Sequence, residues 1–528
     1  MKNQTARGRA WLTRAALAVM LAMPMSADAR DPDPHFEDVQ SSLAAWDLAA
    51  AKSDAAAIPP GALRDVALGV IAVYEGRYAA AESLLAGSLA AGTLAEGGPT
   101  EEATHYLGLA RGSTRALADA VTIHSDDGQV LAVFADEKDA LIAPYLFEAM
   151  ASAREALGDD LGLRPTEPVR FEFLDDSLKL AMVTPLSTEN IRTTGTVGVT
   201  KYRRIMMVSP RIMFYGYGWI DTAVHEYVHY LVTLRTQNRA PVWLQEGLAK
   251  LLETRWRRAE PEPLAEPVAY RLHQAIKRDE LVTVEEMYPS VAMLPSQELA
   301  ALAYAEVQTM LELLRERRGA PGIELLLDRV AAGDDAKDAL ATAWGDDFDA
   351  FMTEWKRVTL RRTARKEDGP LAKRKFKDGK ETPPEALGDV FSHLGGGKAR
   401  QHARLGTLLQ QRDHDVAATI QYEKARAADA RARKDPMLSR RLGRLYGELG
   451  AFARAAPLLD VAAQAEPDNA NLAAAQGHAH LKTGDPAKAR AAIDRAIRVN
   501  PFIPSLHCDL AELASDATIK AAELKHCK

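Results

Sequence analysis

The sequence predicts an α+β domain, in which a mixed sheet packs against helices, combined with all-helical repeats. β-Favouring runs alternate with helical segments between residues 119 and 360. A period of 34 residues recurs from residue 399 to the C-terminus, and such a period is typical of stacked helix pairs. Aromatic residues make up only 6% of the chain and alanine is abundant, so we expect a mostly helical protein.

Length and charge limit the possible classes of protein. The chain has 528 residues, which is too long for one ordinary domain. Its net charge of -7 argues against nucleic acid as a general partner, because such domains usually carry a strongly basic face. No apolar run reaches the roughly 18 residues needed to cross a bilayer, so no membrane span is expected.

Residues 1–29 are typical of a cleavable signal peptide. Basic residues lead into the apolar run Ala15 to Met25, and Ala27-Asp28-Ala29 places small residues at both positions that determine cleavage. We expect cleavage after Ala29 and a periplasmic or secreted protein. An uncleaved anchor and an accidental apolar N-terminus are the alternatives.

Residues 30–118 are expected to form an N-terminal helical region. The motifs Ala67-Leu68-Gly69 and Gly76-Arg77-Tyr78 place a small residue where two helices touch and a glycine turn between them. With the alanine-rich segment that follows, they resemble a tetratricopeptide helix pair. One such pair cannot bury its own apolar face, so it must pack on the next domain or on the C-terminal repeats.

Strand signals begin at residue 119. Asp126-Asp127-Gly128 between two β-favouring runs predicts a hairpin. The further elements expected before residue 220 are a helix at 140–157, a strand at 169–174, and a strand or hairpin within 193–208.

The sequence His225-Glu226-Tyr227-Val228-His229 is predicted to lie on a helix from Thr222 to about Leu234, with Asp221 at its N-cap. Residues four apart share one helix face, so the two histidines can present their imidazole nitrogens to one ion. Zinc at a catalytic site takes three protein ligands and leaves one position to water. Glu246, on a second helix after Pro241, is the best candidate for the third ligand.

This helix and the segment Trp243-Leu244-Gln245-Glu246-Gly247-Leu248-Ala249 together resemble the gluzincin family, in particular the peptidase-MA-like domains of bacterial proteins. The resemblance covers roughly residues 119–360 and is specific only within 225–253. It implies a zinc-dependent peptidase in which His225, His229 and Glu246 bind the metal and Glu226 is the general base. Its substrates would be proteins or peptides.

The same resemblance suggests two further parts of the site. Gluzincins often use a downstream tyrosine or histidine to stabilise the transition state; Tyr304 is our candidate, with Tyr270 and His273 as alternatives. Each of these residues could instead belong to the core. In zincin peptidases an edge strand also holds extended substrate, and Gly195 to Val199 could be that edge. A plain structural hairpin is the alternative.

Lys250 departs from the pattern of thermolysin-like relatives, which carry an aspartate four residues after the glutamate ligand to orient a histidine. Zinc-bound histidines nearly always donate their other N–H group, so another acceptor is needed. Glu253, seven residues after Glu246 on the same helix face, is the candidate for this supporting role. Without such support the domain could be a binding module that has lost activity.

The C-terminal part is expected to be a basic, Gly- and Pro-rich linker at 361–398 followed by repeats at 399–528. Leu405-Gly406, Leu442-Gly443 and Gln476-Gly477 recur, and Gly450 and Gly484 stand 34 residues apart. This period resembles the tetratricopeptide repeat, and it implies three repeats whose concave face holds a peptide or protein partner. Repeats that only dock on the peptidase are the alternative.

Cys508 and Cys527 are the only cysteines. In an oxidising compartment they would form a disulfide that closes a loop of about 20 residues. Two free thiols, or a second metal site with the adjacent His507 and His526, are the alternatives.

Two functions of different classes therefore remain. One is a secreted zinc-dependent endopeptidase whose repeats present or select protein substrates. The other is a scaffold of the cell envelope, in which an inactive zincin fold and the repeats only bind partners.

Overall fold

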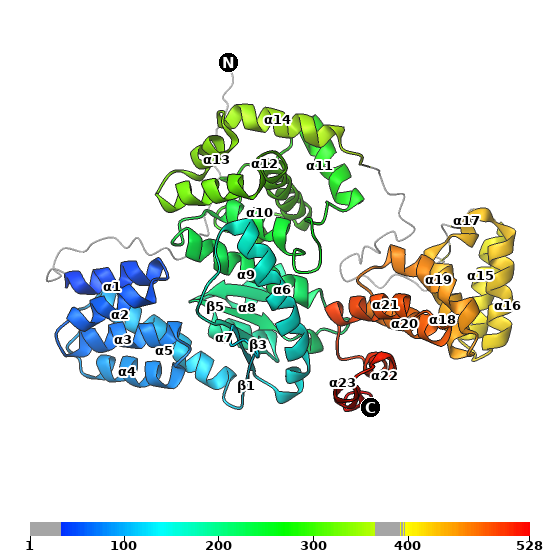
Figure 1. Ribbon diagram of the computed structural model, residues 1–528, viewed down its shortest axis with the longest axis horizontal. Coiled ribbons are helices and arrows are strands. Elements are labelled where there is room, and N and C mark those ends of the chain that lie inside the picture. Colours follow the sequence, from blue (N-terminus) through cyan, green and yellow to red (C-terminus); the bar gives the residue numbers. More distant parts are fainter. Residues whose placement is uncertain (1–32, 365–390, 392–393, 395–396) are drawn as a thin grey trace, which may run out of the picture.

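The computed structural model describes residues 33–364, 391, 394 and 397–528. The expected signal peptide with its cleavage after Ala29, and most of the expected linker, lie outside these residues. A mixed sheet with helices is followed by all-helical repeats, which confirms the predicted fold class (Figure 1). No helix in the described ranges is long and apolar enough to cross a membrane.

The N-terminal region consists of helices, as predicted. In α3 and α4, Gly69 faces Leu85 so closely that an added Cβ would lie 2.6 Å from its Cγ. The helices share one hydrophobic core with the sheet and its helices, so the pair packs on the next domain. The helices are α1 (Pro34–Ala44), α2 (Leu48–Ala57), α3 (Ala62–Tyr74), α4 (Tyr78–Ala90) and α5 (Gly98–Ala116).

The sheet has five strands in the order β1-β2-β3-β5-β4. The β1–β2 pair is the predicted antiparallel hairpin, β2, β3 and β5 are parallel, and β4 returns antiparallel to β5 at the edge. The strands are β1 (Val121–His124), β2 (Val130–Phe134), β3 (Val169–Leu174), β4 (Gly198–Lys201) and β5 (Arg204–Val208).

The prediction of strand or hairpin from residue 193 was wrong at its start. Residues 193 and 194 end helix α8 (Thr188–Thr194), because the Ser187 side chain accepts the Asn190 N–H and caps that helix. Gly195 then stops α8 in the left-handed conformation, with φ +70°. The edge strand therefore begins at Gly198, and of the expected 195–199 segment only its last two residues belong to it.

Helices cover both faces of the sheet and complete the central domain (Figure 1). The expected helix at 140–157 is a short 3-10 turn η1 (Glu137–Ile142) that leads into α6 (Ala143–Leu161). Helix α12 has a kink at Gly319, where φ is 68°. The remaining elements are α7 (Ser177–Val183), η2 (Pro210–Ile212), α9 (Trp219–Arg235), α10 (Val242–Leu252), α11 (Glu266–Arg278), η3 (Val291–Met293), α12 (Gln297–Ala331), α13 (Ala336–Trp344) and α14 (Phe348–Arg361).

An aromatic cluster joins the N-terminal helices to the β4–β5 hairpin. Both turn residues, Tyr202 and Arg203, have positive φ, at 54° and 55°. This conformation costs roughly 1–2 kcal/mol for a residue with a side chain. The Tyr202 ring packs edge-on against Tyr74 and Tyr106, with ring centroids 5.5 and 5.8 Å away. The N-terminal helices thereby hold the turn that positions the edge strand.

The C-terminal repeats show one recurring contact. Gly406, Gly443 and Gly477 each face a large side chain sixteen residues later, on the partner helix, so that an added Cβ would lie 2.6 to 3.0 Å from it. Gly69 and Leu85 have the same spacing. The helices are α15 (Gly397–Gln410), α16 (Asp415–Ala428), α17 (Ala430–Arg433), α18 (Pro436–Glu448), α19 (Phe452–Ala465), α20 (Ala470–Lys482), α21 (Pro486–Val499), α22 (Pro504–Leu513) and α23 (Ala517–Leu524).

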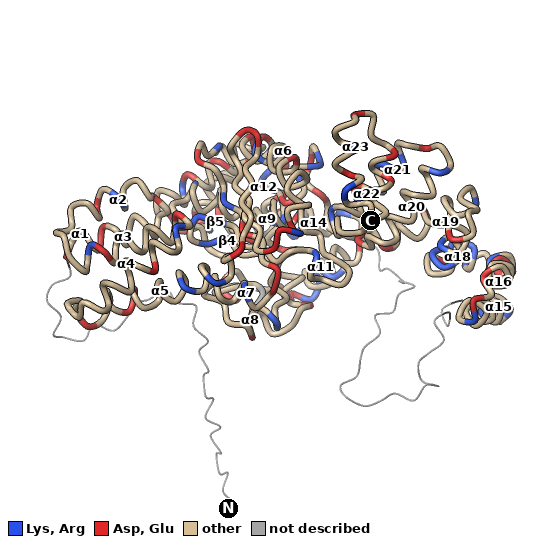
Figure 2. Tube along the Cα trace, turned by 90° about the horizontal axis from the view of Figure 1, so that it is seen from below, with Lys and Arg blue, Asp and Glu red and all other residues tan. Residues whose placement is uncertain are grey.

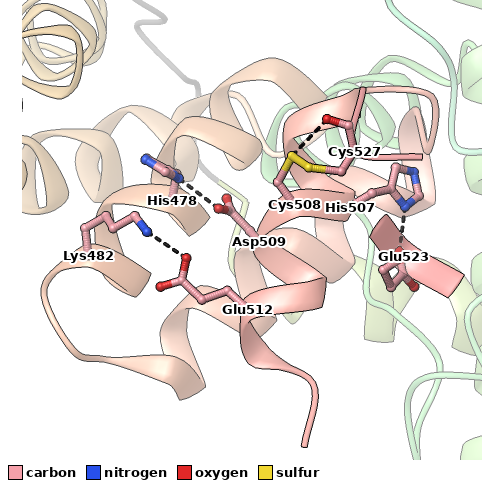
Figure 3. The surroundings of a disulfide bond; sticks show 8 residues. All are labelled: His478, Lys482, His507, Cys508, Asp509, Glu512, Glu523 and Cys527. Atoms are coloured by element: carbon pink, nitrogen blue, oxygen red, sulfur yellow. Dashed lines mark hydrogen bonds and ion pairs between the residues drawn. A yellow bond between two sulfur atoms is a disulfide. The ribbon is translucent and has the colours of Figure 1, made fainter. Parts of the chain in front are cut away.

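A disulfide joins Cys508 to Cys527 and fastens the C-terminal end of the chain to α22 (Figure 3). His507 is not a metal ligand here, because its Nδ1 lies 2.7 Å from Glu523 and its Nε2 lies 2.7 Å from the Pro501 carbonyl. Of the alternatives for the two cysteines, the structure has the disulfide.

The last repeat docks on the segment that leads into α9. The Trp219 indole donates a hydrogen bond to the Ile497 carbonyl at 2.8 Å, and the Tyr217 N–H donates to the Val499 carbonyl at 3.0 Å. Trp219 is fully buried. Gly216 has φ +70°, and a Cβ there would lie 2.1 Å from the Val499 carbonyl oxygen.

We expect Gly216→Ala to release the C-terminal repeats from the central domain. The alanine would be strained by its positive φ and would also overlap Val499. Gly92→Ala is the matched control, because Gly92 has φ +63° and open space around it. Limited proteolysis and thermal unfolding should show a larger loss for Gly216→Ala than the roughly 1–2 kcal/mol expected from φ alone. Equal losses for both variants would contradict this docking.

Candidate metal centre

Helix α9 carries His225, Glu226 and His229 as predicted, but it begins three residues earlier than expected. Asp221 is not its N-cap; that position is Gly218, with no capping side chain. The Asp221 carboxylate instead accepts hydrogen bonds from the Trp256 indole at 2.8 Å and from Arg257 at 2.9 and 3.0 Å. These partners attach the first turn of α9 to the segment after α10.

Three potential ligand atoms converge between α9 and α10. His225 Nε2 and His229 Nε2 are 3.2 Å apart, and Glu246 Oε2 lies 3.5 and 3.7 Å from them. A tetrahedral metal ion with ligand distances of about 2.0–2.1 Å has ligand-to-ligand edges of about 3.3 Å. The triangle of side chains therefore has the size that such an ion requires, and these three residues could hold one.

The Nδ1 atoms of both imidazoles, which point away from the convergence point, form hydrogen bonds. His225 Nδ1 lies 2.9 Å from Glu253 Oε2, and because a carboxylate can only accept, Nδ1 carries the proton. His229 Nδ1 lies 3.1 Å from the Gln245 carbonyl oxygen, while the Gln245 amide group donates to Thr233 Oγ1 at 3.2 Å. Glu253 thus occupies the supporting position expected for it. Gln245 was missed by the sequence analysis.

The proton positions leave acceptors facing one another. With hydrogen on Nδ1, each neutral imidazole presents a lone pair at Nε2, and Glu246 Oε2 is a buried atom without a hydrogen-bond partner. Three acceptors within 3.2 to 3.7 Å of one another repel unless a metal ion or an additional proton lies between them. The arrangement fits a bound metal ion.

The charges around the three side chains also favour a cation. Burial opposes protonation of His225, but Glu246 and Glu253 outweigh it and raise its pKa to about 9, so a proton occupies its Nε2 when no metal ion is bound. Burial would raise the pKa of Glu246, yet the two histidines hold it at about 2. Lys250, in place of the aspartate of thermolysin-like proteins, donates to Glu253 at 3.0 Å and orients that carboxylate.

The Glu226 side chain is held by the edge strand β4. It is only 7% exposed, and the Thr200 hydroxyl lies 2.7 Å from its Oε2 and 2.8 Å from its carbonyl oxygen. A Cβ on Gly198 would lie 2.8 Å from Glu226 Oε1, so glycine is needed for this close approach. Thr200 was not among the expected site residues.

Tyr304 on α12 lies beside the same carboxylates. Burial, followed by the charges of Glu246, Glu226 and Glu253, raises its pKa, so its hydroxyl keeps its proton. The Lys250 ammonium lies 5.8 Å from the centroid of its ring. Of the alternatives, His273 interacts with the backbone of Thr359 on α14, and no described contact links Tyr270 with the centre.

Two segments of the chain match known protein families. Residues 149–360 match the Peptidase MA superfamily, and residues 448–505 match a tetratricopeptide repeat family. No curated protein matches the chain significantly. Two solved structures of yeast LTA4 hydrolase, native and in complex with Bestatin, are similar at 12% and 13% identity, with TM-scores of 0.31 and 0.30. Each match covers 78% of this chain and 67% of the other.

We expect Glu253→Ala to weaken metal binding about 10- to 100-fold, because His225 loses the acceptor that fixes its ring and tautomer. Competition titration of zinc against a chelator would measure this change. Glu266→Ala, on the exposed start of α11, is the control and should leave affinity unchanged. Identical affinities for both variants would exclude the supporting role of Glu253.

Proposed function

We propose that this chain, in which residues 149–360 form a Peptidase MA superfamily domain and tetratricopeptide repeats follow, is a zinc-dependent endopeptidase acting on protein substrates. The observation that carries the proposal is the convergence of His225 Nε2, His229 Nε2 and Glu246 Oε2, all of them acceptors. Two nitrogens and one oxygen are the ligand set of gluzincin-type peptidases, and they leave one position for water.

A bound zinc ion would supply Lewis acidity and a water molecule of lowered pKa. The protein's own residues would then move the proton. Glu226 stands next to His225 on α9, with its carboxylate held by Thr200, and we assign it as the base that takes a proton from water and delivers it to the leaving amine. Tyr304, with its proton retained, is proposed to donate a hydrogen bond to the developing negative charge.

The edge strand β4 is the proposed place for the substrate backbone. It pairs with β5 on one side only, and its residue Thr200 touches Glu226. An extended peptide added along the free edge would be a further strand of the sheet, bound through main-chain hydrogen bonds. Main-chain pairing would bring a peptide bond to Glu226 whatever side chains the substrate carries. Selection among substrates would therefore depend on other surfaces, such as the repeats.

We also propose that the enzyme acts in the periplasm or outside the cell. The basic and apolar pattern of residues 1–29, with small residues before Arg30, supports export. The disulfide between Cys508 and Cys527 supports an oxidising compartment, where such bonds persist. Figure 2 shows lysine and arginine residues interspersed with acidic residues over the described elements.

We expect Glu226→Gln to abolish peptide hydrolysis while zinc remains bound. The amide has nearly the same shape but cannot accept a proton, so kcat/KM should fall by at least about 10²–10⁴-fold. Inductively coupled plasma mass spectrometry should find one zinc in both proteins, with cleavage only by the wild type. Full-length protein without metal would instead indicate a scaffold that only binds partners.

We expect Thr200→Val to lower kcat about tenfold with little change in zinc content, because Glu226 loses the hydroxyl that orients its carboxylate. Thr200→Ser keeps that hydroxyl and should restore most of the rate. Steady-state kinetics on a peptide substrate would separate kcat from KM. If valine and serine variants were equally impaired, Thr200 would matter only for packing of β4.

A further inference from the structure

An open pocket of about 430 Å³ lies on the N-terminal region, away from the metal centre. It is bounded by the α3–α4 turn, by the first turn of α4 and by the last turn of α5. The lining residues are Gly76 to Ala80 on one side, and Ser113, Thr114, Leu117 and Ala118 on the other. No carboxylate lines it.

The first turn of α4 provides free N–H groups at this pocket. The N-cap residue, Arg77, makes no capping hydrogen bond with its side chain. The first intrahelical bond is donated by Ala81, so the N–H groups of residues 78–80 have no partner among the described residues. A helix N-terminus also carries partial positive charge. The Arg77 side chain, 56% exposed, stands at the same place; its Nε and Nη2 form an ion pair with Glu75, and its Nη1 has no partner among the described residues.

Two hydroxyl groups on α5 give an independent indication. Ser113 is fully buried, and neither Ser113 Oγ nor Thr114 Oγ1 has a hydrogen-bond partner. A serine or threonine within a helix usually bonds the carbonyl four residues earlier, as Thr104 does with Thr100 at 2.7 Å in the same helix. A buried hydroxyl without a partner costs free energy, so both groups are suited to an external acceptor.

The side chains behind the pocket include two positive charges and one negative charge. Arg170 and Arg204 share a single buried carboxylate, Glu172, at 2.6 and 3.5 Å. Both guanidinium groups lie near the ring of Tyr78, the first residue of α4, at 5.6 and 4.8 Å from its centroid. One positive charge therefore remains without a carboxylate partner on the inner side of the helix start, where it attracts an anion.

We propose that this pocket binds a phosphate group through the first N–H groups of α4, the Ser113 and Thr114 hydroxyls and the Arg77 guanidinium. A phosphate has enough oxygen acceptors for all of these donors, and helix N-termini bind it readily. The volume exceeds that of a bare phosphate, which leaves space for the molecule that carries the group. The site is independent of the metal centre and of the proposed peptidase activity.

Isothermal titration of the full-length protein with inorganic phosphate and with O-phosphoserine, at constant ionic strength, tests the proposal. We expect saturable binding, weakened about tenfold by Ser113→Ala and by Arg77→Ala, since each removes one donor to the anion. Arg115→Ala is the matched control on the same helix and should bind as the wild type does. Tighter binding of O-phosphoserine than of phosphate would indicate a phosphate ester as the ligand, and equal binding the free ion.

A stability measurement separates binding from folding. Ser113→Ala should unfold at the same or a higher temperature than the wild type without ligand, because its hydroxyl has no partner to lose. Added phosphate should then raise the melting temperature of the wild type more than that of the variant. The proposal is overturned if no saturable binding occurs up to about 10 mM, or if Ser113→Ala and Arg77→Ala bind as tightly as the wild type.

Discussion

The convergence of three part-buried acceptor atoms, which need a metal ion or a proton between them, is the constraint on which the centre of this protein depends. His225 and His229 turn their lone pairs toward Glu246 because Glu253 and Gln245 accept the protons of their outer nitrogens. Such an arrangement is unfavourable unless a metal ion or an additional proton is bound, so the fold must supply the energy that holds the side chains together. It does so with the packed core around α9 and α10, in which Tyr227, Val228 and Leu248 are fully buried.

The flanking parts of the chain both act on α9 from outside the central domain. On one side, the N-terminal helices pack against Tyr202 and so hold the hairpin whose strand carries Thr200 to Glu226. On the other side, the last repeat accepts hydrogen bonds from Tyr217 and Trp219 just where α9 begins. The repeats are therefore attached directly to the start of the helix that carries His225, Glu226 and His229.

Much of the centre could be predicted because helical spacing is a local property. Residues four apart on α9, and seven apart on α10, share a helix face in any fold, which is why His225 was paired with His229 and Glu253 with Glu246. Thr200 could not be found in this way, since it is close to Glu226 only through the pairing of the edge strand. Gln245 directly precedes Glu246 in the sequence, but its contact with His229 depends on how α9 and α10 cross. Asp221 was misassigned because its partners, Trp256 and Arg257, lie a helix away in sequence. The helical end of α8 was missed because the Ser187 cap outweighed the β preference of the threonines that follow.

X-ray absorption at the zinc edge of the purified, full-length protein tests the central claim most directly. The account predicts one zinc with two imidazole nitrogens and two oxygens at about 2.0–2.1 Å, one oxygen from Glu246 and one from water, and no sulfur. The Glu246→Ala variant should lose one of these oxygens or the metal itself. A spectrum with sulfur ligands, or one that is unchanged by Glu246→Ala, would contradict it.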